Sequence, residues 1–233
     1  MKTLSKMRAP KKSWLKRFLI IFLPAIVTFG FNCLVYFITK FLILPERFIY
    51  PDMAIDRLIP FIPQFVIIYY LSFAQWVNYY IQASLGDLKR CDRYFSAYIL
   101  AKIICFFIFI IWPIAMRWPV LPENGNIWTK ILAFTYGVDS PARAFPSLHC
   151  FYSWIAFRYS LESEPANRRW ISVLQLLFSL AVFATTMLIK QHYFIDVIGG
   201  IALAEICLQI AGHTGLPELF GRLMDKLNRV LSL

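Results

Sequence analysis

Acidic side chains are scarce in this sequence: 13 Asp and Glu stand against 24 Lys and Arg, which leaves a formal net charge of +11. Such an excess of positive charge is often a mark of nucleic-acid binding. Here, however, the basic residues are scattered among apolar segments rather than gathered on a soluble domain, and basic connections between apolar segments are topology signals of membrane proteins. We therefore expect no nucleic-acid partner.

The sequence also lacks paired cysteines and a cleavable leader. Its five cysteines are far apart and include no C-x-x-C pair, so neither a zinc site nor a disulfide framework is indicated, and we interpret the thiols as packing residues. The basic N-terminal segment, residues 1–17, leads into an apolar run too long for a signal-peptide core and without a small-residue cleavage site. We expect it to stay attached, on the cytoplasmic side of a membrane.

Apolar side chains dominate what is present: they make up 59% of the 233 positions, with 22 Phe, 12 Tyr and 7 Trp among them. This composition indicates a multi-spanning membrane protein. The sequence predicts an all-α fold, a polytopic membrane helix bundle with six transmembrane helices at residues 18–44, 58–85, 94–116, 147–161, 170–189 and 192–211. The membrane domain is thus residues 18–211, and the connection 117–145 is predicted to be a long loop.

The tail, residues 212–233, is predicted to be an amphipathic surface helix because Leu219, Leu223, Leu227 and Val230 fall on one helical face. The basic residues predict the orientation: sixteen lie on the side of the two termini and seven on the other side. The remaining one, Lys102, lies near one end of the third span and is expected to snorkel to the headgroups. We therefore expect a multi-pass protein of the cell membrane with both termini cytoplasmic.

Two histidines lie in polar segments that this topology places at one depth on the outer side, and ionisable residues at membrane depth mark function. His192 and Asp196 are four residues apart, so on a helix they share one face and the carboxylate can orient the imidazole. A neutral imidazole held in this way can attack phosphorus and form a phosphohistidine. His149 is the available acid for the leaving oxygen. The structural alternatives are a pair that buttresses a helix turn and an interfacial packing histidine. The scheme requires no metal and no cofactor.

The non-bridging oxygens of a phosphate need positive charge and hydrogen-bond donors. Arg117, Lys190 and Ser147 are candidates, together with backbone N–H groups where the fourth span begins. Arg143 joins them through its nearness to Ser147 in the sequence. Structural alternatives exist here too, because Arg117 and Lys190 can be interfacial or snorkelling cations and Ser147 can cap a helix.

The segments that carry these residues resemble motifs of a known family, the type-2 phosphatidic acid phosphatase superfamily. Residues 144–149, AFPSLH, resemble its second motif, P-S-x-H, and residues 190–196, KQHYFID, resemble its third, H-x-x-x-D. Residues 117–119, RWP, resemble the arginine end of its first motif, with a Trp interposed before the Pro. The layout of six spans around these segments is also similar, so the resemblance covers nearly the whole chain.

The resemblance implies a role for each matching residue: nucleophile His192, its orienter Asp196, general acid His149, and phosphate ligands Arg117 and Ser147. Two positions depart from the pattern. Ile110 stands where a lysine is expected, and Thr186 stands where an arginine is expected. Lys190 and Arg143 are candidates to replace those charges. The variant pattern is similar to the branch that contains inositol- and choline-phosphotransferases of sphingolipid synthesis.

The leading hypothesis is a membrane phosphatase that hydrolyses a lipid phosphate or isoprenoid diphosphate at the outer leaflet, with the lipid bilayer and its lipid phosphate as partners. A phosphotransferase that passes the phospho-headgroup to an alcohol is the first alternative. A metal-dependent hydrolase is another, since His149, His192 and Asp196 are of the types that hold Zn²⁺. A transporter or lipid-binding protein is the last, and the absence of an obvious repeated half disfavours it.

Overall fold

The computed structural model describes residues 14–233, so most of the basic N-terminal segment, residues 1–13, lies outside the described residues. Within the described range the chain is helical and contains no β-strand. The α-helices are α2 (Trp14–Leu42), α3 (Ala54–Leu58), α4 (Val66–Leu85), α5 (Leu88–Ile111), α6 (Ile127–Val138), α7 (Leu148–Ser163), α8 (Arg169–Leu188), α9 (Phe194–His213) and α10 (Leu216–Val230). The all-α fold that the composition predicts is confirmed.

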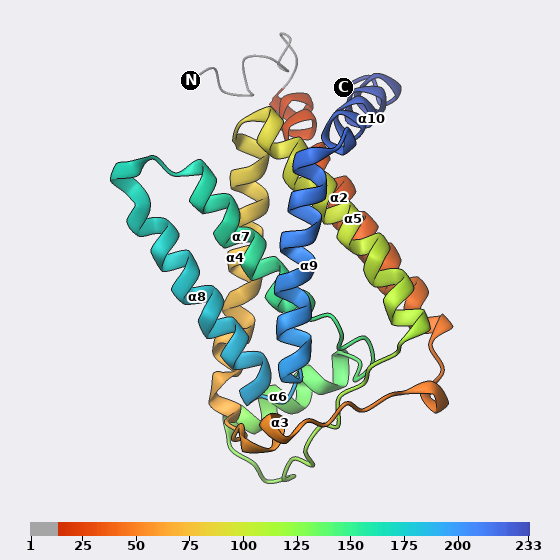
Figure 1. Ribbon diagram of the computed structural model, residues 1–233, viewed down its shortest axis with the longest axis vertical. Helices are drawn as coiled ribbons and strands as arrows, with labels where there is room; N and C mark the ends of the chain where they lie inside the picture. Colours follow the sequence, from red (N-terminus) through yellow and green to blue (C-terminus); the bar gives the residue numbers. More distant parts are fainter. Residues whose placement is uncertain (1–13) are drawn as a thin grey trace.

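The long helices α2, α4, α5, α7, α8 and α9 run side by side along the long axis of the molecule (Figure 1). In this bundle α7 packs on α8, α9 and α4, while α5 packs on α2 and α9. The short helices α3 and α6 lie at the lower end of the bundle in Figure 1, and α10 lies at the upper end. The bundle therefore has two different ends, and the polar segments around His149 and His192 belong to the lower one.

Four of the helical segments are long and apolar enough to cross a membrane: α2, α5, α9 and residues Ala166–Leu188, which combine a short 3-10 turn with α8. The two remaining long helices differ in composition or length. Gln75, Asn78 and Gln82 interrupt the apolar run of α4, and α7 has only 16 residues. By length and composition, membrane crossing is thus supported for four of the six predicted spans.

The predicted start of the second span and both predicted bounds of the third are wrong. Prolines explain the second span, and a cap and a proline explain the third. The second begins at Val66 rather than at residue 58, because Pro60 and Pro63 precede the long helix and Pro63 opens a 3-10 turn instead. The third begins at Leu88, where the Asp87 carboxylate accepts the Arg90 N–H at 3.1 Å. It ends at Ile111, before Pro113. Residues 88–93, which include Lys89, Arg90 and Arg93, are therefore helical and not part of a loop between the second and third spans.

Lys102 does not snorkel, contrary to the prediction. Its side chain is fully buried, and its Nζ lies 4.6 Å from the ring centroid of Tyr152 and 5.5 Å from that of Tyr98. Because α5 begins at Leu88, Lys102 lies in the middle of this helix. It is therefore too far from either end for its side chain to reach the headgroups. The π-faces of the two tyrosines surround the ammonium group in place of water.

The connection 117–145 is not entirely loop, because α6 forms within it. Asn126 caps this helix by accepting the N–H groups of Trp128 and Thr129 at 3.0 and 3.1 Å. The buried residues of α6 include Thr129 and Thr135, whereas Phe134 is exposed. The helix thus buries Leu132 together with the two threonines, while Ile127, Phe134 and Val138 are exposed, so one of its sides presents apolar residues outward.

The tail is helical, as predicted, and Leu227 of its predicted apolar face packs against the main core. Phe220 and Met224 of α10 pack into the main core, mostly against α5. Leu219, Leu223 and Val230, which belong to the predicted apolar face, are exposed. The apolar side of the helix is therefore only partly covered: Phe220, Met224 and Leu227 lie against the bundle, and Leu219, Leu223 and Val230 remain uncovered in the described part of the chain.

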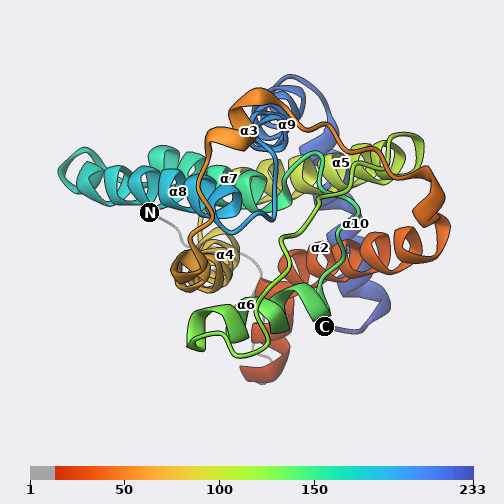
Figure 2. The same cartoon turned by 90° about the horizontal axis from the view of Figure 1, so that it is seen from below.

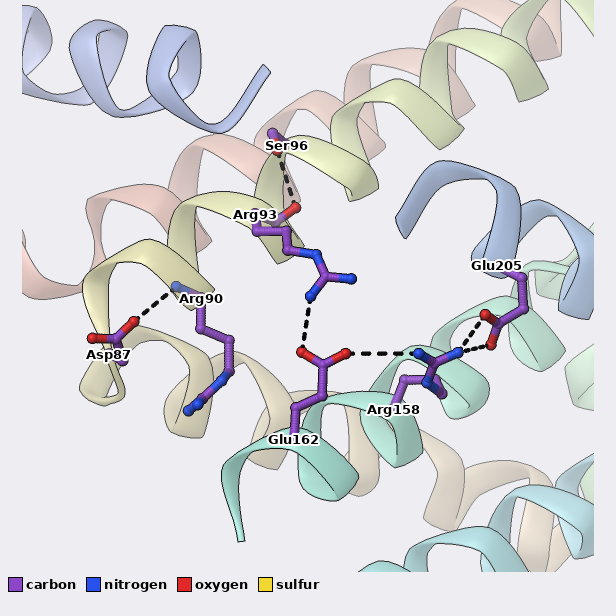
Figure 3. A network of polar contacts seen from close by, with 7 residues as sticks. All are labelled: Asp87, Arg90, Arg93, Ser96, Arg158, Glu162 and Glu205. Atoms are coloured by element: carbon purple, nitrogen blue, oxygen red, sulfur yellow. Dashed lines mark hydrogen bonds and ion pairs between the residues drawn. The ribbon is translucent and has the colours of Figure 1, made fainter. Parts of the chain in front are cut away.

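A network of ion pairs joins three helices, α5, α7 and α9 (Figure 3). Arg158 of α7 pairs with Glu205 of α9, and Arg93 of α5 pairs with Glu162 of α7 at 3.0 Å. The indole N–H of Trp154 also donates to Glu205, at 2.6 Å. These contacts hold α5, α7 and α9 together at the upper end, which leaves their lower ends to form the site.

Candidate active site

The starts of α7 and α9 meet at the lower end of the bundle, and two glycines permit the contact. The Ser147 N–H donates to the backbone oxygen of Asp196 at 2.9 Å. A Cβ at Gly200 would lie 2.4 Å from the backbone oxygen of Ser147, and one at Gly199 would lie 2.4 Å from the ring of Phe145. Because no side chain fits there, α9 can approach the segment before α7 closely and bring the two predicted motifs together.

His192 and Asp196 are in contact, although not as two residues of one helix. His192 precedes α9, and the helix begins at Phe194 because the Asp196 carboxylate caps it by accepting the Tyr193 N–H at 2.8 Å. The same oxygen, Oδ2, lies 3.4 Å from Nδ1 of His192. Both side chains are buried, and Oδ1 of Asp196 has no hydrogen-bond partner among the described residues. One carboxylate thus caps α9 and orients the imidazole.

A tight turn between α8 and α9 presents His192. The N–H groups of Gln191 and His192 both donate to the Thr186 carbonyl, at 2.8 and 3.1 Å, and Lys190 adopts the left-handed backbone conformation with φ 52°. The buried Thr186 hydroxyl donates to the Phe183 carbonyl within α8. Thr186 therefore supports the turn through its backbone and is absent from the residues that line the pocket described below.

Lys190 makes a contact that the sequence does not predict. Its Nζ donates to the backbone oxygens of Ile59 and Asp56, at 2.6 and 3.1 Å. The ammonium group thus holds the turn before α9 against the end of α3. Because these carbonyls take its hydrogen bonds, Lys190 is absent from the residues that line the pocket.

Asp56 also supports the site, and sequence reasoning missed it. Its Oδ1 accepts the Phe194 N–H at 2.7 Å and its Oδ2 accepts the Met53 N–H at 3.1 Å, so one buried carboxylate caps α3 and satisfies the first N–H of α9. Burial raises the pKa of the hydroxyl of Tyr193, the residue before α9. In sequence Asp56 is one acid in a polar connection, without a signal that links it to residues so far away.

His149 lies in the first turn of α7, in an aromatic setting. Its ring centroid is 4.4 Å from that of Tyr69, 5.0 Å from that of Trp76 and 5.9 Å from that of His192. Its Nε2 is buried and has no hydrogen-bond partner among the described residues. Packing thus fixes the ring, while one nitrogen remains free for a ligand.

Ser147 is the N-cap of α7, as the structural alternative has it. Its Oγ accepts the Cys150 N–H at 3.3 Å. The side chain is fully buried and is not among the residues that line the pocket. Capping and phosphate binding are compatible roles, since a helix N-terminus offers its remaining N–H groups to an anion.

A pocket opens between these groups and contains both histidines. Its lining residues are Tyr36, Phe109, Asp139, Ser140, Pro141, Ala142, Arg143, Ala144, Leu148, His149, Gln191 and His192. Arg143 is the cation in this lining. It adopts the left-handed backbone conformation with φ 67°, its Cζ lies 4.1 Å from the ring centroid of Tyr36, and its buried Nη2 has no hydrogen-bond partner among the described residues. Two imidazoles and a guanidinium with one unpartnered nitrogen thus line this space and can bind an anion, although the Asp139 carboxylate belongs to the same lining.

The structure does not bring Arg117 to this pocket. Its side chain is exposed, and its Cζ lies 4.6 Å from the ring centroid of Tyr50, in the extended segment after α5. Within residues 14–233, moreover, no three His, Cys, Asp or Glu side chains lie close enough together to hold a metal ion. Of the predicted site residues, four form a cluster: His149, His192, Asp196 and Arg143. Ser147 is a buried helix cap, and Arg117 and Lys190 make other contacts.

Comparison with known proteins adds one match. A family model described as the PAP2 superfamily matches residues 59–210, which is more than half of the chain and includes both histidine segments. A search of curated proteins found no match.

Proposed function

The chain belongs to the PAP2 superfamily, whose members are phosphatases, and on that premise we propose that it is an integral membrane phosphatase. The proposed substrate is a lipid phosphate or an isoprenoid diphosphate, and the proposed intermediate is a phosphohistidine. The observation that carries the proposal is the pocket in which the rings of His149 and His192 lie 5.9 Å apart, with Asp196 behind one of them.

In the first step, His192 attacks phosphorus through Nε2, because its Nδ1 faces Asp196. The new N–P bond forms as the P–O bond to the lipid breaks. Protonated His149 donates its proton to the leaving oxygen. The carboxylate of Asp196 keeps the imidazole in one tautomer and stabilises the positive charge that develops on it.

In the second step, water attacks the phosphohistidine and the N–P bond breaks. His149, now neutral, accepts the proton of the water, which restores both histidines and releases inorganic phosphate. Arg143 is the proposed ligand of the non-bridging oxygens, because its Nη2 is unpartnered among the described residues and it lines the pocket. The scheme uses no metal ion.

We further propose that α4 and α7 cross the membrane along with the four more apolar helices, since both pack between them in the bundle. The Lys16 ammonium donates to the Ser232 carbonyl at 2.7 Å, so the start of α2 and the end of the tail lie at one end of the bundle, away from the pocket. With the bias of basic residues this supports cytoplasmic termini and a pocket at the outer face of the cell membrane.

Phosphate release by the purified protein tests the proposal. A panel of lipid phosphates and isoprenoid diphosphates is incubated with the wild type in EDTA, with His192→Ala and His213→Ala alongside. His213 is a matched control because it is exposed at the far end of α9, where Nδ1 lies 2.9 Å from the Gln209 carbonyl. We expect release that persists in EDTA, is lost in His192→Ala and is kept in His213→Ala. Loss in EDTA, or release by His192→Ala, would contradict the mechanism.

A phosphotransferase is the second candidate, and one observation favours it. Thr186, where the family pattern has an arginine, is buried within α8, and Arg117 lies outside the pocket, so the pocket has fewer cations than the family pattern implies. Water and an alcohol attack the same intermediate. Product analysis with and without a candidate alcohol acceptor distinguishes them, because transfer yields a phosphorylated alcohol in place of inorganic phosphate.

A further inference from the structure

A second hollow adjoins the catalytic pocket and has a different character. Its lining residues are Tyr36, Tyr69, Tyr70, Phe73, Thr135, Val138, Asp139 and His149. Tyr36, Asp139 and His149 also line the catalytic pocket. The two spaces are therefore neighbours with a shared wall, and the outer one, which we call the aromatic groove, is lined mostly by rings.

The aromatic groove lies between α2, α4 and α6, at the end of the bundle seen in Figure 2. The hydroxyls of Thr135 and Tyr70 lie 2.9 Å apart and join α6 to α4. Beside this contact Phe73 and Val138 are exposed. The mouth of the groove is thus apolar, and it opens on the side where α6 presents apolar residues outward.

The wall between the groove and the pocket is a hydrogen-bonded bridge. The Asp139 carboxylate accepts the Tyr36 hydroxyl at 3.4 Å and the Tyr69 hydroxyl at 3.3 Å, and so links α2 to α4 through the end of α6. Both distances are long for O–H···O bonds, so the bridge is weak. The Arg143 guanidinium lies over the Tyr36 ring, with Cζ 4.1 Å from the ring centroid.

We propose that the aromatic groove is the entrance through which a membrane lipid phosphate reaches the pocket, with the Tyr36–Asp139–Tyr69 bridge as the barrier that its headgroup parts. The occupant of the groove is the lipid chain, which lies along Tyr70, Phe73 and Val138 while the phosphate reaches Arg143 and His192. The proposal rests on the proposed function and adds the path and the residues that favour a lipid over a water-soluble phosphate.

Two features favour this occupant. The groove adjoins the pocket, because three residues line both. A lipid whose phosphate lies at His192 therefore has its chain next to the aromatic rings of the groove. The path also holds hydrogen-bond donors, beside the Asp139 carboxylate, which repels an anion and must move aside with the bridge. When the bridge parts, the hydroxyls of Tyr36 and Tyr69 lose Asp139 as acceptor and can donate to the phosphate oxygens, next to Arg143.

A substitution that fills the groove tests the entrance. Val138→Trp places an indole at its mouth, and Val138→Phe places a smaller ring there. Phe134→Trp is the matched control, because Phe134 lies one turn earlier on the same side of α6, is 65% exposed against 64% for Val138, and does not line the groove. The measured quantity is the ratio of kcat/KM for phosphatidic acid in phosphatidylcholine vesicles to kcat/KM for para-nitrophenyl phosphate in water.

We expect the ratio to fall at least about tenfold in Val138→Trp, less in Val138→Phe and not in Phe134→Trp, because a filled groove excludes a lipid chain. A ratio that stays within about threefold of wild type in Val138→Trp overturns the entrance while the proposed function stands. A wild type that hydrolyses para-nitrophenyl phosphate alone also overturns the entrance. A wild type that hydrolyses neither para-nitrophenyl phosphate nor any lipid phosphate or isoprenoid diphosphate of the panel overturns the proposed function, and the entrance with it.

Discussion

At the scale of single residues, the binding of a phosphate in the pocket depends on side-chain atoms that make no hydrogen bond to neighbouring residues. Nε2 of His149 and Nη2 of Arg143 are buried and unpartnered among the described residues. A buried polar group without a partner costs about 1–3 kcal/mol. A bound phosphate would complete the hydrogen bonds of these two groups, and the predictions at this scale follow from that proposal.

Asp196→Asn should leave the fold intact and lower kcat by about 10²- to 10⁴-fold. The Asn side-chain oxygen can still accept the Tyr193 N–H and cap α9, but the amide favours the wrong tautomer of His192. Steady-state kinetics together with thermal unfolding in detergent would separate the two effects. Turnover near that of the wild type would rule out His192 as an oriented nucleophile.

His149→Ala should retain phosphorylation by a substrate whose leaving group needs no proton, such as para-nitrophenyl phosphate. Natural lipid substrates should lose about 10²- to 10⁴-fold in rate, because their alkoxide needs the general acid. Trapping of the labelled phosphoenzyme after a rapid alkaline quench, which preserves the N–P bond, would measure the first step directly. An equal loss on both kinds of substrate would remove the general-acid role.

Arg143→Gln should lower kcat/KM by roughly 10²-fold, because the guanidinium is the cation in the lining of the pocket. Arg117→Gln is the informative comparison, since Arg117 is the phosphate ligand that the sequence resemblance implies but its side chain packs on Tyr50. We expect the loss in Arg143→Gln to be larger by at least about tenfold. The reverse order would restore Arg117 as the principal ligand.

At the scale of elements, the site depends on how closely α9 approaches the start of α7. Gly200→Ala would bring a Cβ within 2.4 Å of the Ser147 backbone oxygen, so the helices must separate, and the free energy of unfolding should fall by about 1–3 kcal/mol with a loss of activity. Gly30→Ala in α2 is the control, because a Cβ there meets nothing within 4 Å and should stabilise the helix by about 0.5–1 kcal/mol. Equal stability of the two variants would show that the close approach is unimportant.

At the scale of the whole molecule, the bundle separates a network of ion pairs at one end from the pocket at the other. With cytoplasmic termini, a cysteine in the 117–126 connection should react with a membrane-impermeant maleimide on intact cells, and a cysteine in the tail should not. Glu123→Cys and Ser232→Cys are suitable positions, because both side chains are exposed. Labelling of Ser232→Cys alone would invert the topology and put the pocket at the cytoplasmic face.

Much of this architecture follows from local sequence. Long apolar runs predicted the helices of the bundle, because a backbone without water must satisfy its hydrogen bonds within a helix. Ser147 was recognised as a cap and the tail as a helix for equally local reasons. The proximity of His192 and Asp196 followed from their spacing, although the cap at Tyr193, rather than a shared helix, produces the contact.

Only the tertiary structure decided which charges reach the pocket. Lys190 is held by carbonyls near α3, Lys102 is enclosed by tyrosines, and Arg143 reaches the pocket from a loop. Asp56 and the bridge at Asp139 join segments far apart in the chain. Helix formation depends on neighbours within a few residues, so the sequence by itself determined the helices and the family motifs. The partner of a long, flexible charged side chain depends on packing between distant segments, which only the folded bundle specifies.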